Sequence, residues 1–479
     1  MTLETIASTP IEGQKPGTSG LRKKTHIFMQ PHYLENFIAA IWIGIGGVEG
    51  KTLVLGGDGR YFNDRAAQVI LRMAAASGAK KIIIGQDALL STPAASNLIR
   101  MRMADGGIIL SASHNPGGPE EDFGVKFNTP NGGPAPEEVT ERIFEATKSI
   151  NSYEIIATQD VDISTLGTTS LADMEVEVVD PVADYQMLME SLFDFGKIRD
   201  LLNSGFNLRF DALHAITGPY ATAILEFALG AGPGSVVNGI PLPDFGKGHP
   251  DPNPIWAKNL VEHMMAEDAP DFGAASDGDG DRNMIMGRGI YITPSDSVAV
   301  LAANAELVPA YRGNMKGVAR SMPTSRALDR VAEDLGIECF ETPTGWKFFG
   351  NLLDAGKATI CGEESAGTGS NHIREKDGLW AVLFWLNILA ETRLSVAEIM
   401  EKHWRQYGRN YYSRHDYEAI DTEVANELMQ ALRAKLPTLA GQEIDGRKII
   451  NADDFAYDDP VDGSHSKNQG IRLEMEGGA

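Results

Sequence analysis

Short apolar runs that end at glycine or aspartate recur along the first half of the chain, at 51–60, 80–87, 106–115 and 207–215. Between them lie segments with apolar residues at helical spacing, such as 65–77. Apolar runs bounded by turn residues predict buried strands, so we expect strands and helices to alternate in parallel α/β sheets. In such sheets, ligands bind at the carboxyl ends of the strands.

Further helices are predicted at 220–232, 297–313 and 325–336, each ending at a glycine, and one more near 422–435. We therefore expect three similar mixed α/β sheet domains around a cleft, followed by a smaller α+β domain. The 479 residues suit two to four domains. The predicted boundaries give domains at 1–184, 185–300, 301–404 and 405–479.

The net charge of −24 narrows the range of partners. Nucleic acid needs a basic footprint, and an anionic membrane surface repels an acidic protein, so we expect neither partner. An anionic metabolite can still bind where part of the 42 lysines and arginines gather in one cleft. The absence of a signal-peptide pattern and of an apolar run near ~18 residues predicts a cytoplasmic location.

The segment SASHNPGG at 111–118 follows an apolar run, which places Ser113 and His114 at the carboxyl end of a strand. Backbone N–H groups in such a loop can hold an anion, and a nucleophile is expected there. A serine–histidine pair alone also suits an ordinary loop. The G-x-S-x-G frame of a hydrolase is missing.

The run DGDGDR at 277–282 places Asp277, Asp279 and Asp281 at alternate positions in a predicted strand–loop–strand segment. Three carboxylates in one tight loop can converge on a hard divalent cation, and a phosphate oxygen can complete its coordination. An EF-hand is excluded because Arg282 and Arg288 occupy its sixth and twelfth positions. A solvated acidic turn is the alternative.

Two glycine-rich loops, at 345–350 and 362–378, mix carboxylate, hydroxyl and cationic groups. Glu363 and Ser365 can hydrogen-bond sugar hydroxyls, and Arg374 and Lys376 can bind phosphate. A third loop at 17–24 adds Arg22, Lys23 and Lys24 beside small residues that let backbone approach an anion. Each loop alone is also compatible with a surface turn.

Taken together, these loops resemble the α-D-phosphohexomutase superfamily, and most closely its phosphoglucomutases. The resemblance runs nearly end to end. It is carried, in order, by GTSGLRK, GIILSASHNPGG, DFGVKFN, DFGAASDGDGDRN, RSMPTSRALD, ETPTGWKFFGN, GEESAGTGS and HIREKDGLWA.

The resemblance implies an isomerase that moves phosphate between C1 and C6 of glucose through a phosphoserine at Ser113. It implies Mg²⁺ as cofactor, held by Ser113, Asp277, Asp279 and Asp281. The implied catalytic residues are Ser113, Lys376, His114 and Arg22, with His114 and Lys376 competing for proton transfer. The implied substrate-binding residues are Thr18, Arg22, Lys126, Asp281, Arg282, Thr344, Gly345, Glu363, Ser365 and Lys376.

The implied cycle passes phosphate from Ser113 to O6 of glucose 1-phosphate. Glucose 1,6-bisphosphate then turns over in the cleft, returns its C1 phosphate to Ser113, and also serves as activator. A loose phosphoryl-transfer transition state needs positioning and charge neutralisation, which a metal ion and cationic loops supply. The implied partners are small hexose phosphates, and the implied state is a monomer or a weak dimer.

Three positions depart from the pattern expected of the family: Ala366 replaces an aromatic residue, Asn371 an aspartate, and Arg326 a small residue. The chain ends at Ala479 before the phosphate-binding loop that the resemblance implies, so the fourth domain is expected to be incomplete. Loss of that distal anchor is expected to weaken or abolish turnover, because remote binding energy assists catalysis.

Two other functional classes stay open. One is a phosphomannomutase, an amino-sugar mutase or a phosphatase with the same nucleophile and metal. A phosphatase would release phosphate steadily, whereas a mutase returns it to sugar. The other is a non-catalytic scaffold on a mutase fold, which would carry no phosphate on Ser113 after exposure to the bisphosphate.

Overall fold

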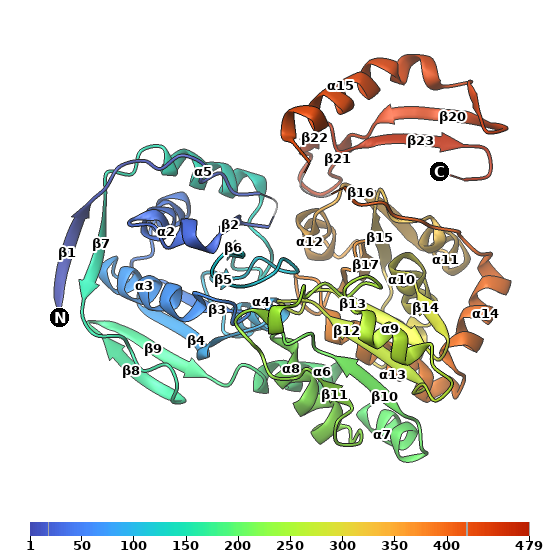
Figure 1. Ribbon diagram of the computed structural model, residues 1–479, viewed down its shortest axis with the longest axis horizontal. Coiled ribbons are helices and arrows are strands. Elements are labelled where there is room, and N and C mark those ends of the chain that lie inside the picture. The colour runs from blue at the N-terminus through green and yellow to red at the C-terminus, as the bar shows by residue number, and fades with distance from the viewer. Residues whose placement is uncertain (18, 418–419, 479) are drawn as a thin grey trace.

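The computed structural model describes residues 1–17, 19–417 and 420–478 (Figure 1). Thr18, a predicted substrate contact, lies outside the described residues. The three large sheets contain both parallel and antiparallel pairs and are followed by a small C-terminal sheet, so the predicted mixed α/β multidomain class is confirmed. The predicted domain boundaries stay predictions.

The first sheet has seven strands in the order β2-β6-β5-β3-β4-β9-β8. The inner strands β5, β3, β4 and β9 are parallel. β6 pairs antiparallel with β5, and the edge strands β2 and β8 pair antiparallel with β6 and β9. The strands are β2 (Leu21–Lys24), β3 (Thr52–Gly57), β4 (Lys81–Leu89), β5 (Gly107–Leu110), β6 (Asp122–Asn128), β8 (Gly167–Leu171) and β9 (Met174–Val179). The helices are α1 (Thr25–Phe28), α2 (Tyr33–Gly44), α3 (Asn63–Ala76), α4 (Thr92–Met101) and α5 (Glu137–Thr147), and β1 (Thr2–Ala7) pairs with β7 (Ser152–Ala157).

The second sheet has five strands in the order β11-β10-β12-β13-β14. They are β10 (Leu208–Asp211), β11 (Val236–Val237), β12 (Phe272–Ser276), β13 (Asn283–Gly287) and β14 (Ile290–Ile292). The helices are α6 (Ala183–Leu192), α7 (Phe195–Asn203), α8 (Thr217–Ala221), α9 (Lys258–Met264), the π-helix η1 (Thr222–Ala228) and the short η2 (Phe245–Lys247). β12 and β13 confirm the predicted strand–loop–strand around the aspartate run.

The third sheet has four strands in the order β16-β15-β17-β18. They are β15 (Gly317–Ser321), β16 (Glu338–Thr342), β17 (Ile360–Gly362) and β18 (Thr368–Ser370). Around it lie α10 (Pro294–Ala303), η3 (Ala305–Leu307), α11 (Ala327–Leu335), α12 (Trp346–Asp354), α13 (Gly378–Thr392) and α14 (Val396–Tyr407).

The C-terminal unit is smaller and lies against the side of the third sheet where β16 and α12 are found (Figure 1). It contains α15 (Thr422–Leu439) and the strands β19 (Glu443–Ile444), β20 (Arg447–Asp454), β21 (Tyr457–Asp458), β22 (His465–Ser466) and β23 (Ile471–Met475). No residue of α15 is buried. This unit therefore adds little to the core.

Two helix predictions need correction. The helix predicted at 297–313 ends at Ala303, because the Asn304 side chain donates a hydrogen bond to the Val300 carbonyl and caps that end. The segment at 220–232 starts earlier, at Thr217, and widens into a π-helix. There the N–H of Leu229 bonds to the carbonyl of Ile224, five residues back. The prediction at 325–336 is confirmed by α11, which ends at a left-handed Gly336.

We call each of the three large sheets, with the helices around it, the first, second and third unit. One apolar core runs through all three. It includes Val54 and Ile83 of the first sheet, Phe210 of the second, and Val318 of the third. Helix α13 crosses this core and is buried from Gly378 to Ala390, which explains why its sequence is apolar on every face. In the described ranges, no single helix is long and apolar enough to cross a membrane, while the bent pair α13 and α14 passes by length and composition only.

Candidate active site

The loop after β5 holds Ser113 in a fixed, strained position. Ser113 is buried and has a left-handed backbone with φ of 54°, which is uncommon outside glycine. Its N–H donates to Ser111 Oγ at 2.7 Å, and its carbonyl accepts from Arg60 Nη2 at 2.7 Å. Arg60 is itself paired with Asp58 at 2.9 Å. These contacts leave the Ser113 hydroxyl as the group that the loop presents.

The loop between β12 and β13 brings the three predicted aspartates together. Asp277, Asp279 and Asp281 are buried, and a ligand oxygen from each lies within 4.8 Å of the others. The Oδ1 atom of Asp277 accepts the N–H groups of Asp281 and Arg282 at 2.9 and 3.0 Å, which closes the loop.

The serine and aspartate loops meet directly. Ser113 Oγ donates to Asp277 Oδ2 at 2.8 Å. A Cβ atom added to Gly278 would lie 2.3 Å from the Ser113 carbonyl oxygen, so only glycine allows this approach. The nucleophile predicted in the first unit therefore lies within reach of the cation site predicted in the second.

The donor set fits a divalent cation. Asp279 Oδ2 pairs with Lys126 Nζ and accepts from Thr92 Oγ1 at 2.7 Å. Asp281 Oδ2 pairs with Lys376 Nζ at 3.2 Å. The Oδ1 atoms of Asp279 and Asp281 are buried and, among the described residues, have no hydrogen-bond partner. Buried carboxylate oxygens without donors are costly unless a ligand completes them, and a hard cation such as Mg²⁺ does so.

The electrostatics of the aspartate loop agree with this reading. Burial, together with the charges of Asp281 and Asp279, raises the pKa of Asp277 well above its usual value. Burial also acts to raise the pKa of Asp279, but the Lys126 ammonium outweighs it, and this pKa is lowered. The three carboxylates thus repel one another, and a bound cation would offset that repulsion.

Cationic side chains surround the same corner. Burial lowers the pKa of Arg22 on β2. The negative charges of Asp279 and Asp281 act in the opposite direction and limit this lowering. Arg282 Nη1 lies 3.4 Å from Asp251 Oδ1, and its buried Nε has no partner among the described residues. Burial opposes the charge on Lys376, but the nearby Asp281 and Glu363 raise its pKa. These cations are suited to bind phosphate oxygens.

His114 lies beside the nucleophile, with Nδ1 at 3.4 Å from Ser113 Oγ. Burial, reinforced by the charges of Arg282, Arg22 and Lys376, lowers the pKa of His114 far below its usual value. The imidazole is therefore neutral near pH 7 and adds no positive charge beside Ser113.

The predicted sugar-binding residues come from two loops of the third unit. Glu363 Oε1 accepts the N–H of Gly345 at 3.1 Å, which joins the Thr344 loop to the 363–365 loop. Burial raises the pKa of Glu363. Ala366, where the family resemblance led us to expect an aromatic residue, has a left-handed φ of 74°. The carbonyl oxygen of Ala366 accepts a hydrogen bond at 3.0 Å from the N–H of Asn283, which follows the aspartate run.

A cavity of about 370 Å³ collects most of these groups. Its lining includes His114, Lys126, Asp281, Arg282, Thr344, Gly345, Glu363, Ser365 and Lys376. This volume suits a small polar metabolite. Ser113 and Arg22 do not line the cavity, although His114, in contact with Ser113, does. Lys23 and Lys24 do not line it either, and Lys24 pairs with Asp122 at 3.1 Å.

Several site residues were not predicted. Thr92 begins α4 and contacts Asp279, and Arg60 holds the Ser113 carbonyl. Glu375 is buried, lines the cavity and accepts from Asn128 Nδ2 at 2.8 Å. The charged REKD run contained a signal for Glu375. Arg374 in that run pairs with Asp354 at 2.5 Å instead of pointing at the cavity as predicted.

Comparisons with known proteins agree with this geometry. Models of the phosphoglucomutase/phosphomannomutase α/β/α domains I, II and III match residues 13–154, 184–289 and 294–407. A model of the phosphoglucomutase-1 C-terminal domain matches residues 409–479.

Individual relatives match along the whole chain. A phosphoglucomutase of Rhizobium radiobacter is 60% identical over 100% of this chain and 88% of its own length. A cytoplasmic phosphoglucomutase of Pisum sativum is 52% identical over 100% of this chain and 88% of its own. The open form of the Paramecium phosphoprotein pp63/parafusin, a phosphoglucomutase, has a TM-score of 0.91 at 48% identity and covers 98% of this chain and 87% of its own.

Proposed function

This chain belongs to the phosphoglucomutase/phosphomannomutase family, and we propose that it is a phosphoglucomutase that interconverts glucose 1-phosphate and glucose 6-phosphate. The observation that carries the proposal is the 2.8 Å hydrogen bond from Ser113 Oγ to Asp277, which joins a nucleophile to a three-carboxylate cation site.

In this reaction Ser113 Oγ carries the phosphoryl group. The O6 hydroxyl of glucose 1-phosphate gives up its proton and attacks phosphorus, the P–O bond to Ser113 breaks, the serine oxygen takes up a proton, and glucose 1,6-bisphosphate forms. After the bisphosphate turns over in the cavity, the Ser113 hydroxyl gives up its proton and attacks the phosphorus at C1. The bond from that phosphorus to O1 breaks, O1 takes up a proton, and glucose 6-phosphate leaves. The geometry must therefore present both ends of one sugar to the same serine.

The chain's own residues position the reactants. Ser113, Asp277, Asp279 and Asp281 would hold Mg²⁺, which supplies charge neutralisation at the phosphoryl oxygens. Arg22, Arg282 and Lys376 bind phosphate oxygens. The Glu363 carboxylate accepts hydrogen bonds from the sugar hydroxyls, and the Ser365 hydroxyl donates or accepts one. Thr344 and Gly345 line the cavity beside them.

Two groups are placed to move the proton of the attacking hydroxyl. His114 Nδ1 lies 3.4 Å from Ser113 Oγ, which is a position from which it can accept the serine proton. Lys376 is charged and paired with Asp281, which suits it to hold phosphate and to return a proton at the sugar oxygen. The proposal includes glucose 1,6-bisphosphate as activator, hexose phosphates as the partners, and a cytoplasmic monomer or weak dimer.

A coupled assay with glucose 1-phosphate, Mg²⁺ and catalytic glucose 1,6-bisphosphate tests the proposal. We expect glucose 6-phosphate to form, with little free phosphate, and intact-protein mass spectrometry to find one phosphate on Ser113. Ser113→Ala should lower kcat by roughly 10³-fold or more, because no other residue replaces the nucleophile. The control Ser152→Ala, in β7 of the same unit, should keep full activity. Steady phosphate release, or turnover retained in Ser113→Ala, contradicts the proposal.

A further inference from the structure

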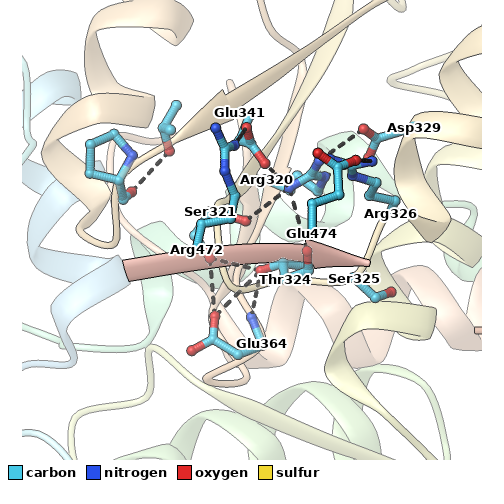
Figure 2. A network of polar contacts seen from close by, with 12 residues as sticks. Arg320, Ser321, Thr324, Ser325, Arg326, Asp329, Glu341, Glu364, Arg472 and Glu474 are labelled. Carbon is cyan, nitrogen blue, oxygen red and sulfur yellow. Dashed lines mark hydrogen bonds and ion pairs between the residues drawn. The ribbon is translucent and has the colours of Figure 1, made fainter. Parts of the chain in front are cut away.

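The C-terminal sheet is joined to the third unit by a chain of ion pairs. Arg472 on β23 lies 2.6 Å from Glu341 Oε2, and Arg326 lies 2.6 Å from Glu474 Oε1 (Figure 2). Arg326 stands where the family resemblance led us to expect a small side chain. Arg472 is also held by Asp453 of β20 at 2.7 Å, so its guanidinium is fixed within its own sheet.

Glu341 connects Arg472 to a buried arginine of the third unit, Arg320. Its Oε1 atom accepts from Arg320 Nη1 at 3.0 Å, so one carboxylate bridges an arginine from each unit. The Arg320 side chain is only 3% exposed, and Asp329 holds its other edge through two hydrogen bonds of 2.5 and 2.9 Å. A guanidinium held on both edges has one orientation.

Arg320 in turn holds the turn that follows β15. Its Nη1 lies 3.4 Å from the carbonyl oxygens of Ser321 and Thr324. Between these two residues, Met322 packs on Phe348, Phe455 and Tyr457, of which the last two belong to the C-terminal unit. The turn is therefore contacted by the C-terminal unit through both charge and apolar packing.

The other side of the same turn holds Glu364. Thr324 Oγ1 accepts the N–H of Glu364 at 2.9 Å, and Ser321 Oγ lies 3.0 Å from Glu364 Oε2 (Figure 2). Glu364 lines the cavity between Glu363 and Ser365, the two predicted sugar contacts. We call the segment 363–365 the sugar loop. Its position is thus fixed by the Ser321–Thr324 turn, which the C-terminal sheet contacts.

We propose that Glu364 is a positioning residue of the sugar loop, and that the Ser321–Thr324 turn transmits to it the docking of the C-terminal sheet through Glu341 and Arg472. Glu364 acts by holding Glu363 and Ser365 in place for the sugar hydroxyls. Affinity for the hexose phosphate should then depend on an ion pair remote from the substrate. The proposal rests on the proposed function for its kinetic readout alone.

A double-mutant cycle tests the link. Arg472→Met and Glu364→Gln, each alone, should raise KM for glucose 1-phosphate by about 5-fold or more and change kcat by less than about 2-fold. The double variant should raise KM no further than the larger single effect, because both changes break one path. Thr324→Val, which leaves the C-terminal unit untouched, should give the same split. Effects on KM that multiply, or that fall on kcat, overturn the proposal.

The matched control is Arg433→Met. Arg433 pairs with Asp454 at 2.7 Å inside the C-terminal unit and makes no contact with the third unit among the interactions of the described chain. It should leave KM unchanged. If Arg433→Met raises KM as much as Arg472→Met, the effect is a general loosening of the C-terminal unit and the proposed path is wrong.

Hydrogen exchange without substrate separates this proposal from the proposed function. The Glu364 N–H is protected by Thr324 Oγ1, so exchange in peptides covering 360–370 should quicken several-fold in Arg472→Met and Thr324→Val but not in Arg433→Met. Exchange unchanged in Arg472→Met, with β20 and β23 still protected, overturns the path even in an active enzyme. Faster exchange in a chain that fails to turn over supports the path while the proposed function falls.

Discussion

Two groups of carboxylates, the aspartate loop and the ion-pair network on Arg320, use the same chemistry in opposite ways. In the network, Glu341 accepts from one arginine on each oxygen, and Arg320 donates to both oxygens of Asp329. In the aspartate loop, two buried oxygens, on Asp279 and Asp281, lack any donor among the described residues. Carboxylates that are fully paired hold the structure together, whereas the unpaired ones indicate a ligand.

The strongest way to break this comparison is to remove charge from the aspartate loop. Asp277→Asn should lower kcat by roughly 10²-fold or more, because the proposed metal site loses a ligand and the phosphoryl charge would be less neutralised. The same change should raise the thermal midpoint of the metal-free protein, because it removes one of three buried charges that repel one another. Scanning calorimetry with EDTA and with Mg²⁺ measures both states.

The unchanged protein should gain stability on adding Mg²⁺, and Asp277→Asn should gain much less. The buried Asp58→Asn is a poor comparison because Arg60 needs it, so the exposed Asp173→Asn serves as control and should keep activity, midpoint and Mg²⁺ response. A lower metal-free midpoint in Asp277→Asn would show that the loop needs its charge for folding, as the network does.

Glu375 lies between the two cases, since it lines the cavity yet accepts a hydrogen bond from Asn128. Burial raises its pKa to about 7, against the opposing charge of Lys126. A carboxyl whose pKa is raised on folding is harmless below pH ~4.5, where both states are protonated, and costs stability as pH rises to about 7. In the unchanged protein, the free energy of unfolding should therefore decline by on the order of 3 kcal/mol between these two pH values, and Glu375→Gln should remove that decline.

Urea unfolding between pH 4.5 and 8 measures this slope. The exposed Glu49→Gln should give the slope of the unchanged protein. If Glu375→Gln leaves the slope unaltered, Glu375 ionises normally in the folded protein and belongs with the fully paired carboxylates.

The smallest effect is expected in the network itself. Arg320→Met leaves Asp329 and Glu341 without their shared partner, and because both are partly exposed we expect a loss of about 2 kcal/mol in the free energy of unfolding. Denaturant unfolding measures it. Lys258→Met, which removes an exposed pair with Glu262, should change stability by less than about 0.5 kcal/mol. A stability loss that Mg²⁺ reverses would contradict the structural assignment.

The fold was predictable where local pattern and tertiary structure agree. The apolar runs that flank DGDGDR become β12 and β13, and the amphipathic segment at 325–336 becomes α11. The pattern failed where a side chain or an inserted residue alters the helix, at Asn304 and within η1. Hydrophobic spacing carries no information on either event.

The site was predictable as far as each loop carries its chemistry in consecutive residues. Asp277, Asp279 and Asp281 share one loop, so their convergence follows from sequence spacing. Thr92 and Glu375 join the site from distant segments, and their side chains gain meaning only from Asp279 and Asn128. The partner of Arg374 could not be foreseen for the same reason, because Asp354 comes from α12.

The absence of a side chain at Gly278 has a mechanical consequence. The Ser113 carbonyl oxygen packs closely against Gly278, and the Ser113 hydroxyl donates a hydrogen bond to Asp277. These two contacts hold the loops of the first two units together as one wall of the site. Parting those loops would break the contact between Ser113 and Asp277 on which the proposed function rests. The opposite wall of the cavity, where Glu363 and Ser365 lie, makes no such contact with Ser113 in the described part of the chain, so room for a reorienting sugar would have to come from that side.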